Sequence, residues 1–208
     1  MPEPLPEISP LALSILELLD ERPMHPYELA SKMRERHHDM FIRLNFGTLY
    51  HTVDVLERNS WIVPVEHEKE GRRPERTIYE LTESGRAQLV RVLSELLAQP
   101  KREYPHFVAG LMFMHHLDAG RAAHLLRERT AAVEAHIEKL GRVLNELRAR
   151  GLTRLSLIEV EHKIAMLEAE RDWVRKVENE ITEGTLPWTV GIDAGDEGLR
   201  RAHGAGTH

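Results

Sequence analysis

The chain of 208 residues is long enough for one large domain or two small ones, and its 30% charged and 5% aromatic residues are typical of a helix-rich protein with much exposed surface. It contains no cysteine, no apolar run near the roughly 20 residues of a membrane span, and no signal-peptide pattern in Met1–Pro10, so we expect a cytoplasmic protein without disulfides, thiolate zinc sites or membrane contact. Its net charge of −6 lies mostly in residues 1–100, which hold 12 Lys/Arg and 17 Asp/Glu, and this predicts weak long-range attraction to nucleic acid.

The first two predicted helices begin at prolines. Ser9-Pro10 supplies a hydroxyl cap followed by proline at the first helical position, and leucines and isoleucine at helical spacing continue to about Asp20. A second helix is predicted from Pro26 to about His37-His38, and a short apolar connector follows it.

A third helix is predicted after Asn45, whose side chain can accept a hydrogen bond from a backbone amide two or three residues later. Leu49, Val53 and Leu56 are spaced to form its buried stripe. The polar residues of its first turns fall on the other faces, so this helix should present a polar surface to solvent.

Two β-prone segments, residues 62–65 and 77–81, flank a charged turn and predict a hairpin. Pro64 has no amide donor, so its strand should lie at the edge of the sheet. Thr82 is a good cap for a fourth helix. Three helices, a hairpin and a further helix in this order predict a winged helix-turn-helix over residues 8–98, a fold that sets one helix into a DNA major groove.

Beyond a linker between Pro100 and Pro105, a second domain of long helices is predicted over residues 105–183. An apolar segment precedes Asp118, which can cap a helix reaching Arg150 with apolar residues in a heptad pattern. A second long helix should follow Gly151. Two charged helices joined by a glycine have too little apolar face to form a stable hairpin alone, so we expect a partner chain and a dimerisation domain. Residues 184–208 are predicted to be an unstructured tail. The fold class is thus mainly α with a small β-hairpin wing.

Four short motifs stand in register along the first domain: Pro23-Met24-His25-Pro26-Tyr27-Glu28-Leu29, Gly47-Thr48-Leu49-Tyr50, Leu56-Glu57-Arg58 and Tyr79-Glu80-Leu81-Thr82-Glu83-Ser84-Gly85. Together they resemble the PadR family of bacterial transcriptional regulators, in particular its members with a long two-helix carboxy-terminal domain. The resemblance implies a homodimer that binds palindromic double-stranded operator DNA, usually represses transcription, and is released by a small molecule. The family commonly has glycine where this chain has Pro26, and glycine near Ser60.

The third helix is the predicted recognition helix, because such proteins read base edges with residues near its N-terminus. Asn45, Thr48 and His51 are candidates for base contacts, Tyr50 for a phosphate contact, and Gly47 for close approach of the backbone. Alternatively, Asn45 only caps the helix and Tyr50 only packs.

The turn of the hairpin carries a second group of candidate DNA contacts. Guanidinium groups on a constrained turn suit phosphate contacts or a narrow minor groove. The basic residues there are Lys69, Arg72, Arg73 and Arg76, interspersed with glutamates that leave a merely solvated turn as the alternative. Tyr27 and Lys32 on the second helix are further candidates for backbone contacts.

Two further sets of residues concern the dimer and an effector. The expected dimer interface comprises Leu152, Leu155, Leu157, Ile164, Leu167 and Trp173. Aromatic walls suit planar apolar ligands, so a pocket for a small aromatic effector is expected where the dimer core meets the winged helices. Its candidate residues, which could equally be plain core, are Trp61, Phe107, Phe113, Met114 and Trp173.

Other functions are less well supported by the sequence. Thirteen histidines suggest a metal- or haem-responsive sensor, but adjacent histidines such as His115 and His116 point about 100° apart on a helix and no i, i+4 pair occurs. We therefore expect surface histidines and no metal or cofactor. Phosphate-binding and nucleophile motifs are absent, so no catalytic residue and no enzymatic activity are expected. A winged helix that binds protein instead of DNA stays an alternative, favoured by the acidic charge.

Overall fold

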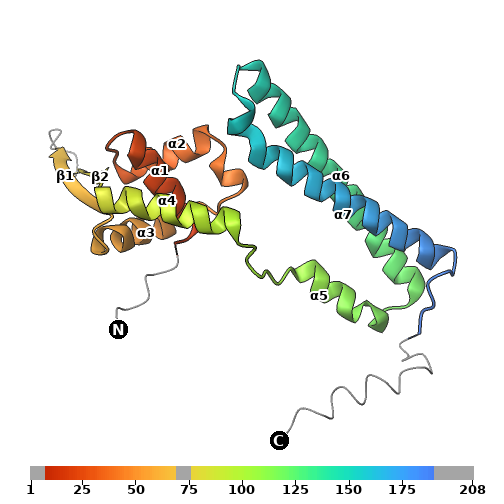
Figure 1. Ribbon diagram of the computed structural model, residues 1–208. Coiled ribbons are helices and arrows are strands. Elements are labelled where there is room, and N and C mark those ends of the chain that lie inside the picture. Colours follow the sequence, from red (N-terminus) through yellow and green to blue (C-terminus); the bar gives the residue numbers. More distant parts are fainter. Residues whose placement is uncertain (1–7, 69–75, 190–208) are drawn as a thin grey trace, which may run out of the picture. The chain divides into compact units, whose positions relative to one another are not determined.

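The computed structural model describes residues 8–68 and 76–189, without the side chains of residues 66–68 and 76. The chain divides into two compact units, residues 1–102 and 103–208, which we describe separately (Figure 1). In the described residues no helix has the length and apolarity that crossing a membrane would require.

Unit 1 has the predicted order of helices and strands. Its elements are α1 (Pro10–Glu21), α2 (Pro26–Glu35), the short 3-10 helix η1 (His38–Met40), α3 (Phe46–Arg58), β1 (Ile62–Glu68), β2 (Arg76–Leu81) and α4 (Glu83–Ala98). The predicted winged helix-turn-helix, mainly α with a β-hairpin, is therefore confirmed.

Local hydrogen bonds begin these helices where the sequence predicts. The side chains of Ser9, Asn45 and Thr82 each accept from the backbone amide three residues later, at 3.2, 2.8 and 3.0 Å. The second helix begins at Pro26 as predicted, but His25 caps it through Nδ1, which accepts from the amide of Tyr27 at 3.0 Å. The start of each of these helices is thus fixed by a hydrogen bond within its own first turn.

The core of unit 1 lies between α1 and the helices that pack on it. The predicted stripe of α3, Leu49, Val53 and Leu56, is buried there. Leu29 and Met33 of α2 also point inward. The core holds α3 by one face, so the opposite face and the first turn stay at the surface.

The hairpin pairs Ile62 with Leu81 and continues with an irregularity between Pro64 and Glu66. Pro64 lies in β1, an edge strand as predicted, because the sheet has the two strands β1 and β2. On its other side, β2 exchanges two backbone hydrogen bonds of 3.1 Å between Tyr79 and Met24. This bridge ties the hairpin to the segment before α2.

The exit from α3 is closed tightly onto the start of α4. Ser60 has a φ of 58°, in the left-handed region that glycine adopts more readily than other residues. The Thr82 hydroxyl lies 2.8 Å from the carbonyl of Ser60 and 3.0 Å from that of Trp61. Gly85 packs against the same Trp61 carbonyl, where a side chain would not fit.

Unit 2 comprises α5 (His106–Phe113), the 3-10 helix η2 (Met114–His116), α6 (Ala119–Ala149), the 3-10 helix η3 (Arg154–Leu157) and α7 (Ile158–Thr182). Asp118 caps α6 as predicted, accepting from the amide of Arg121 at 2.8 Å. The two long helices lie side by side and antiparallel (Figure 1), with the turn at Gly151, whose φ is 85°. Ion pairs Arg148–Glu161 and Arg129–Glu170 connect them along their length.

The predicted heptad pattern of α6 is buried at four positions, Leu126, Val133, Leu140 and Leu144. The two remaining positions, Ile137 and Leu147, are only half-buried. On α7 the buried residues are Val160, Leu167, Val174, Val177 and Ile181. A pair of helices buries one stripe on each, and the flanking apolar residues stay outside it.

The start of the expected unstructured tail is packed against unit 2. Leu186 and Trp188 contact the cluster formed by Ala123, Leu126, Val174, Val177 and Ile181. The indole nitrogen of Trp188 donates to the carbonyl of Leu117 at 2.8 Å. The structured part of unit 2 therefore extends past residue 184, and the expected tail at 190–208 lies outside the described residues.

Candidate nucleic-acid interface

The N-terminal part of α3 presents the predicted recognition residues to solvent. Asn45, Gly47, Thr48, Tyr50 and His51 are all exposed, while Leu49 between them is buried. The helix is thus held by its apolar stripe, and its first two turns offer amide, hydroxyl, phenol and imidazole groups at one surface. This is the end of the helix with which helix-turn-helix proteins read base edges.

Asn45 has less freedom than the other candidates. Its Oδ1 accepts from the amide of Thr48, which leaves only its Nδ2 group as a donor toward a base. The hydroxyl of Thr52, one turn further along, donates to the carbonyl of Thr48 at 2.7 Å and is buried. Thr48 and His51 remain the exposed polar side chains best placed for base contacts.

Two residues that the sequence reasoning missed lie beside these candidates. The Phe46 ring stacks on that of Tyr27, with ring centres 6.0 Å apart and an interplanar angle of 11°. The Arg34 guanidinium lies 5.2 Å from the centre of the Phe46 ring. An aromatic residue directly after the Asn45 cap was the available signal, because the apolar stripe of the helix does not include this position.

The cations of α2 differ in their pairing. Lys32, a predicted phosphate contact, forms an ion pair of 2.8 Å with Glu35. Arg22, just before the helix, pairs with Glu28. Arg34 is exposed, and among the described residues it has the Phe46 ring but no ion-pair partner. Arg34 is therefore a better phosphate ligand than Lys32 on electrostatic grounds.

The basic wing lies largely outside the described residues. Lys69, Arg72 and Arg73 belong to the segment that is not described, and of Arg76 only the backbone, in β2, is described. Their role in binding DNA stays a prediction from the sequence.

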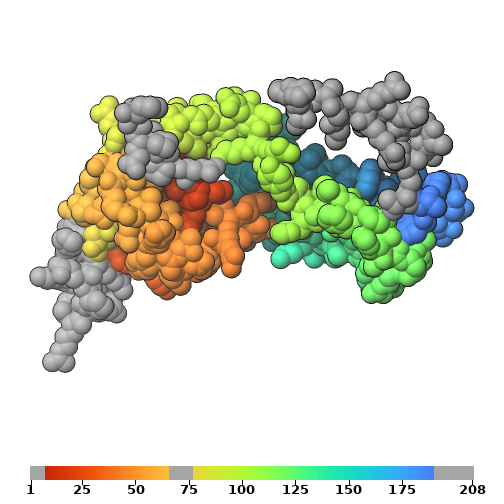
Figure 2. All heavy atoms as spheres, turned by 90° about the horizontal axis from the view of Figure 1, so that it is seen from below, coloured from red at the N-terminus to blue at the C-terminus, as the bar shows by residue number. Residues whose placement is uncertain are grey.

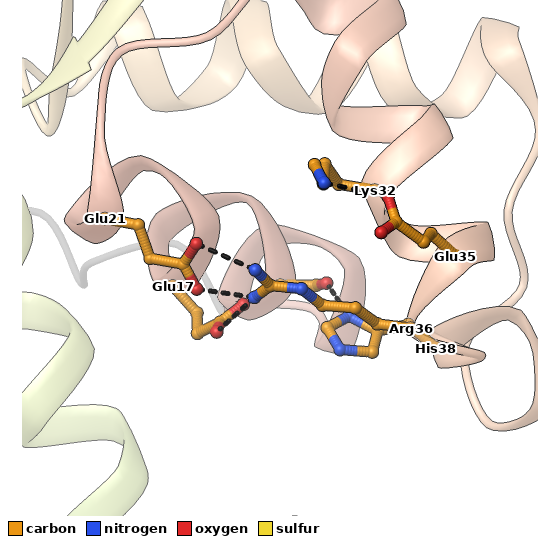
Figure 3. A network of polar contacts seen from close by, with 7 residues as sticks. Glu17, Glu21, Lys32, Glu35, Arg36 and His38 are labelled. Carbon is orange, nitrogen blue, oxygen red and sulfur yellow. Dashed lines mark hydrogen bonds and ion pairs between the residues drawn. The ribbon is translucent and has the colours of Figure 1, made fainter. Parts of the chain in front are cut away.

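A polar network fixes α2 and η1 against α1 (Figure 3). Arg36 forms a bidentate pair with the Glu21 carboxylate, with its second bond at 2.8 Å, and also reaches Glu17 at 3.3 Å. Hydrogen bonding to Arg36 lowers the pKa of Glu21, whereas burial raises the pKa of Glu17. Ser14 of α1 and His38 of η1 share a hydrogen bond of 2.7 Å. The network therefore joins the C-terminal end of α2 and the following η1 to α1.

The predicted dimer residues separate into two groups in unit 2. Leu157 and Leu167 are buried within the chain and leave little surface for a partner, and Ile164 is half-buried. Leu152, Leu155 and Trp173 are exposed, with 81% of Leu155 accessible. This second group has the most surface available for an interface.

The residues predicted for an effector pocket do not come together as one site. Phe107 and Met114 line a cavity of about 280 Å³ beside α5 and α6, together with Leu111, Leu126 and Arg129. Trp61 is instead buried in the core of unit 1, because it closes the exit from α3. Phe113 is exposed, and Trp173 touches Phe107 edge-on from outside the lining. Arg129 lies 3.5 Å from the centre of the Phe107 ring and pairs with Glu170.

The histidines form no cluster suited to a metal in the part of the chain that is described. No group of three or more histidine, aspartate or glutamate residues there has a geometry that could hold an ion. His115 and His116 are exposed, with ring centres 4.3 Å apart.

These observations define the class of protein: a winged helix-turn-helix protein whose recognition helix has an exposed polar N-terminal end. Residues 15–91 match the model of the transcriptional regulator PadR-like family. Most of unit 1 therefore matches a family of transcriptional regulators. None of the curated proteins matches the sequence.

Solved structures share this fold over most of the chain. Bacillus subtilis PadR in complex with operator DNA is 19% identical, with a TM-score of 0.69, over 85% of this chain and 99% of that one. The same protein in complex with p-coumaric acid is 17% identical, with a TM-score of 0.68, over 83% and 98% of the two chains. The Vibrio cholerae virulence activator AphA is 18% identical, with a TM-score of 0.63, over 83% and 98%.

Proposed function

We propose that this protein is a DNA-binding transcriptional regulator, a cytoplasmic homodimer that represses transcription by occupying an operator, and that a small aromatic molecule releases it. The observation that carries the proposal is the end of α3, where Thr48, Tyr50 and His51 are exposed beside a buried Leu49. Two copies of α3 would enter successive major grooves about one helical turn apart. The B. subtilis relative bound to operator DNA supports this mode of binding.

Unpartnered apolar surface in unit 2 supports the homodimer. The helix α5 is almost wholly apolar, yet none of its residues is buried in the single chain, and it lies on the surface in Figure 2. Met112 and Phe113 of this helix are both exposed, as are Leu155 and Trp173. Exposed apolar side chains that lie together, as Trp173 does with Phe107 of α5, usually mark an interface. A second copy would cover it and hold the two recognition helices at a fixed separation.

The cavity between α5 and α6 supports the effector. Its volume of about 280 Å³ suits a molecule with one aromatic ring, and its walls are Phe107, Leu111, Met114 and Leu126. Arg129 at its edge provides a guanidinium group for a carboxylate, although Glu170 already pairs with it. The B. subtilis relative bound to p-coumaric acid supports an aromatic acid as the ligand class. Such a ligand would act by changing the dimer geometry that sets the helix separation.

A mobility-shift assay with the DNA upstream of the protein's own gene tests the proposal. Replacing Thr48 and His51 with alanine should reduce the preference for operator over random DNA. Replacing Arg72 and Arg73 should weaken binding to both and lower its salt dependence. Sedimentation of the same samples at micromolar concentration should give a dimer. A monomer, or equal binding to every fragment, would contradict the proposal.

The same purified protein and DNA fragments distinguish two other functions from the proposed one. The AphA relative is an activator, so transcription from the bound promoter with and without the protein decides the direction of regulation. A winged helix that binds a protein partner is favoured by the net charge of −6. That function would leave every DNA fragment unbound while the dimer persists.

A further inference from the structure

Phe46 stands out on the surface that would face DNA. It is the first residue of α3 and exposes 42% of its surface. Its neighbours Asn45, Gly47 and Thr48 are small or polar, so Phe46 is the large apolar side chain among them. Exposing an aromatic ring to water is unfavourable. A partner that covers the ring would remove this cost, and the proposed partner of this end of α3 is the major groove.

The Phe46 ring is held in place by α2 rather than by the core. Tyr27, the second residue of α2, stacks on it nearly parallel and is itself 62% exposed. Arg34, two turns further along α2, brings its guanidinium to 5.2 Å from the ring centre. A stacked and charge-stabilised ring is pre-organised, so little side-chain freedom is lost when it binds.

A purely structural role, in which the stacked rings act only as a brace that holds α2 against α3, accounts poorly for this arrangement. A brace stabilises by excluding water from both partners, but both rings here keep about half of their surface exposed. The helices are already joined through buried Leu29, Met33 and Leu49. The stack therefore adds little to the packing and has apolar surface left for a ligand.

The chemistry of the major groove identifies what this surface would contact. The C5-methyl group of thymine is the apolar feature on the base edges there, and phenylalanine is among the side chains that contact it. An arginine beside the groove suits a phosphate, and Arg34 has no competing carboxylate among the described residues. We propose that Phe46, supported by Tyr27, reads thymine methyl groups in each operator half-site, and that Arg34 binds the adjacent phosphate. This inference rests on the proposed binding of operator DNA.

The test uses the full chain and a site selected from random duplexes. Each thymine of the site is replaced in turn by deoxyuridine, which removes only the methyl group. At one or two symmetry-related positions, affinity should fall roughly fourfold, the factor that corresponds to burial of one methyl group, about 0.8 kcal/mol. With Phe46→Ala this sensitivity should disappear, while thymines elsewhere behave as before.

Phe41→Ala is the matched control, because Phe41 has the same side chain and is 41% exposed but lies before the cap of α3. This variant should keep the full sensitivity to deoxyuridine. Thermal unfolding of both variants separates loss of reading from loss of folding. If no thymine is sensitive in the wild type, or if Phe46→Ala keeps the same sensitive positions, the reading role is wrong.

Arg34 is tested by the salt dependence of binding. Arg34→Ala should weaken binding to operator and random DNA alike and reduce the slope of log affinity against log salt by about 1 for each half-site. Arg22→Ala removes a guanidinium already paired with Glu28 and should leave the slope unchanged. Equal slopes for wild type and Arg34→Ala would exclude the phosphate contact. Failure of the wild type to select any site would refute the proposed function itself.

Discussion

The two units of this chain solve the problem of burying apolar surface in different ways. Unit 1 encloses one core with helices from several directions and a hairpin, so residues such as Ile15, Leu29 and Ile62 have no exposed surface at all. Unit 2 has two long helices and a short one. These bury a single stripe and leave apolar side chains such as Met112, Phe113 and Leu155 in solvent. The first unit encloses its core alone, whereas the second leaves apolar surface that the proposed second copy would cover.

This difference decides where a substitution should unfold the protein and where it should change assembly or binding. A tight, closed core responds to any added volume. An open two-helix layer tolerates added volume on its outside, but it responds to charge placed on its apolar surface. Four predictions test the contrast.

Gly85→Ala should have the largest effect. A Cβ at this position would lie 2.0 Å from the Trp61 carbonyl oxygen and 2.7 Å from a methyl group of Leu81. The start of α4 must then move away from the exit of α3, and we expect a loss of about 3 kcal/mol of stability. Hydrogen exchange of the α3 and α4 amides measures this loss. Unchanged protection would show that the contact is loose.

Leu155→Glu should dissociate the proposed dimer without unfolding the chain. Leu155 is 81% exposed at the turn of the long hairpin, so a charge costs nothing in the monomer but must be desolvated in an interface. The dissociation constant should rise at least about tenfold, measured by sedimentation. Leu97→Glu, at a position 88% exposed in unit 1, is the control and should leave it unchanged. If both variants have the same dissociation constant, the interface does not include the hairpin turn.

The two carboxylates on Arg36 should respond to pH in opposite directions. Because the pKa of Glu21 is lowered in the folded state, its ionised carboxylate stabilises the fold at pH values above the ordinary pKa of a glutamate. This stabilisation is lost as the pH falls through the folded-state pKa. Because burial raises the pKa of Glu17, its ionisation removes stability as pH rises through the folded value. Glu21→Gln should cost about 0.5 kcal/mol at neutral pH, as expected for a partly exposed pair.

Glu17→Gln is the comparison for this pair and should cost less than Glu21→Gln, because the neutral amide avoids the burial penalty that the carboxylate suffers. Urea unfolding of both variants between pH 4 and 7, at pH values about one unit apart, measures the difference. This spacing is sufficient to resolve the opposite slopes of stability against pH. Parallel pH profiles for the two variants would contradict the assignment of hydrogen bonding to one carboxylate and burial to the other.

Gly141→Ala should have a small effect of the opposite sign. Gly141 lies inside α6, and nothing lies within 4 Å of the Cβ that alanine would add. Alanine reduces the freedom of the unfolded chain, so stability should rise by about 0.5 to 1 kcal/mol in thermal unfolding. A loss of stability or of dimer would mean that a partner chain approaches the helix closely at this glycine.

Much of this fold followed from short-range sequence signals. The caps at Ser9, Asn45, Thr82 and Asp118 were predictable because each forms within three residues of its own position. The spacing of Leu49, Val53 and Leu56 likewise predicted which face of α3 is buried, and hence which face is exposed and can meet DNA. These are properties of one helix and its first turn, so the sequence alone determined them.

The tertiary structure decided everything that depends on residues distant along the chain. Trp61 is buried beneath α4 instead of lining a ligand cavity, since the carbonyl contacts of Thr82 and Gly85 fix it there. Trp188 docks on unit 2 through Leu117, and Phe46 stacks on Tyr27 across two helices. Local patterns specify which faces of a helix are apolar. Which of those faces another segment covers is determined only when the segments pack, because burial is a property of the neighbours as well as of the residue.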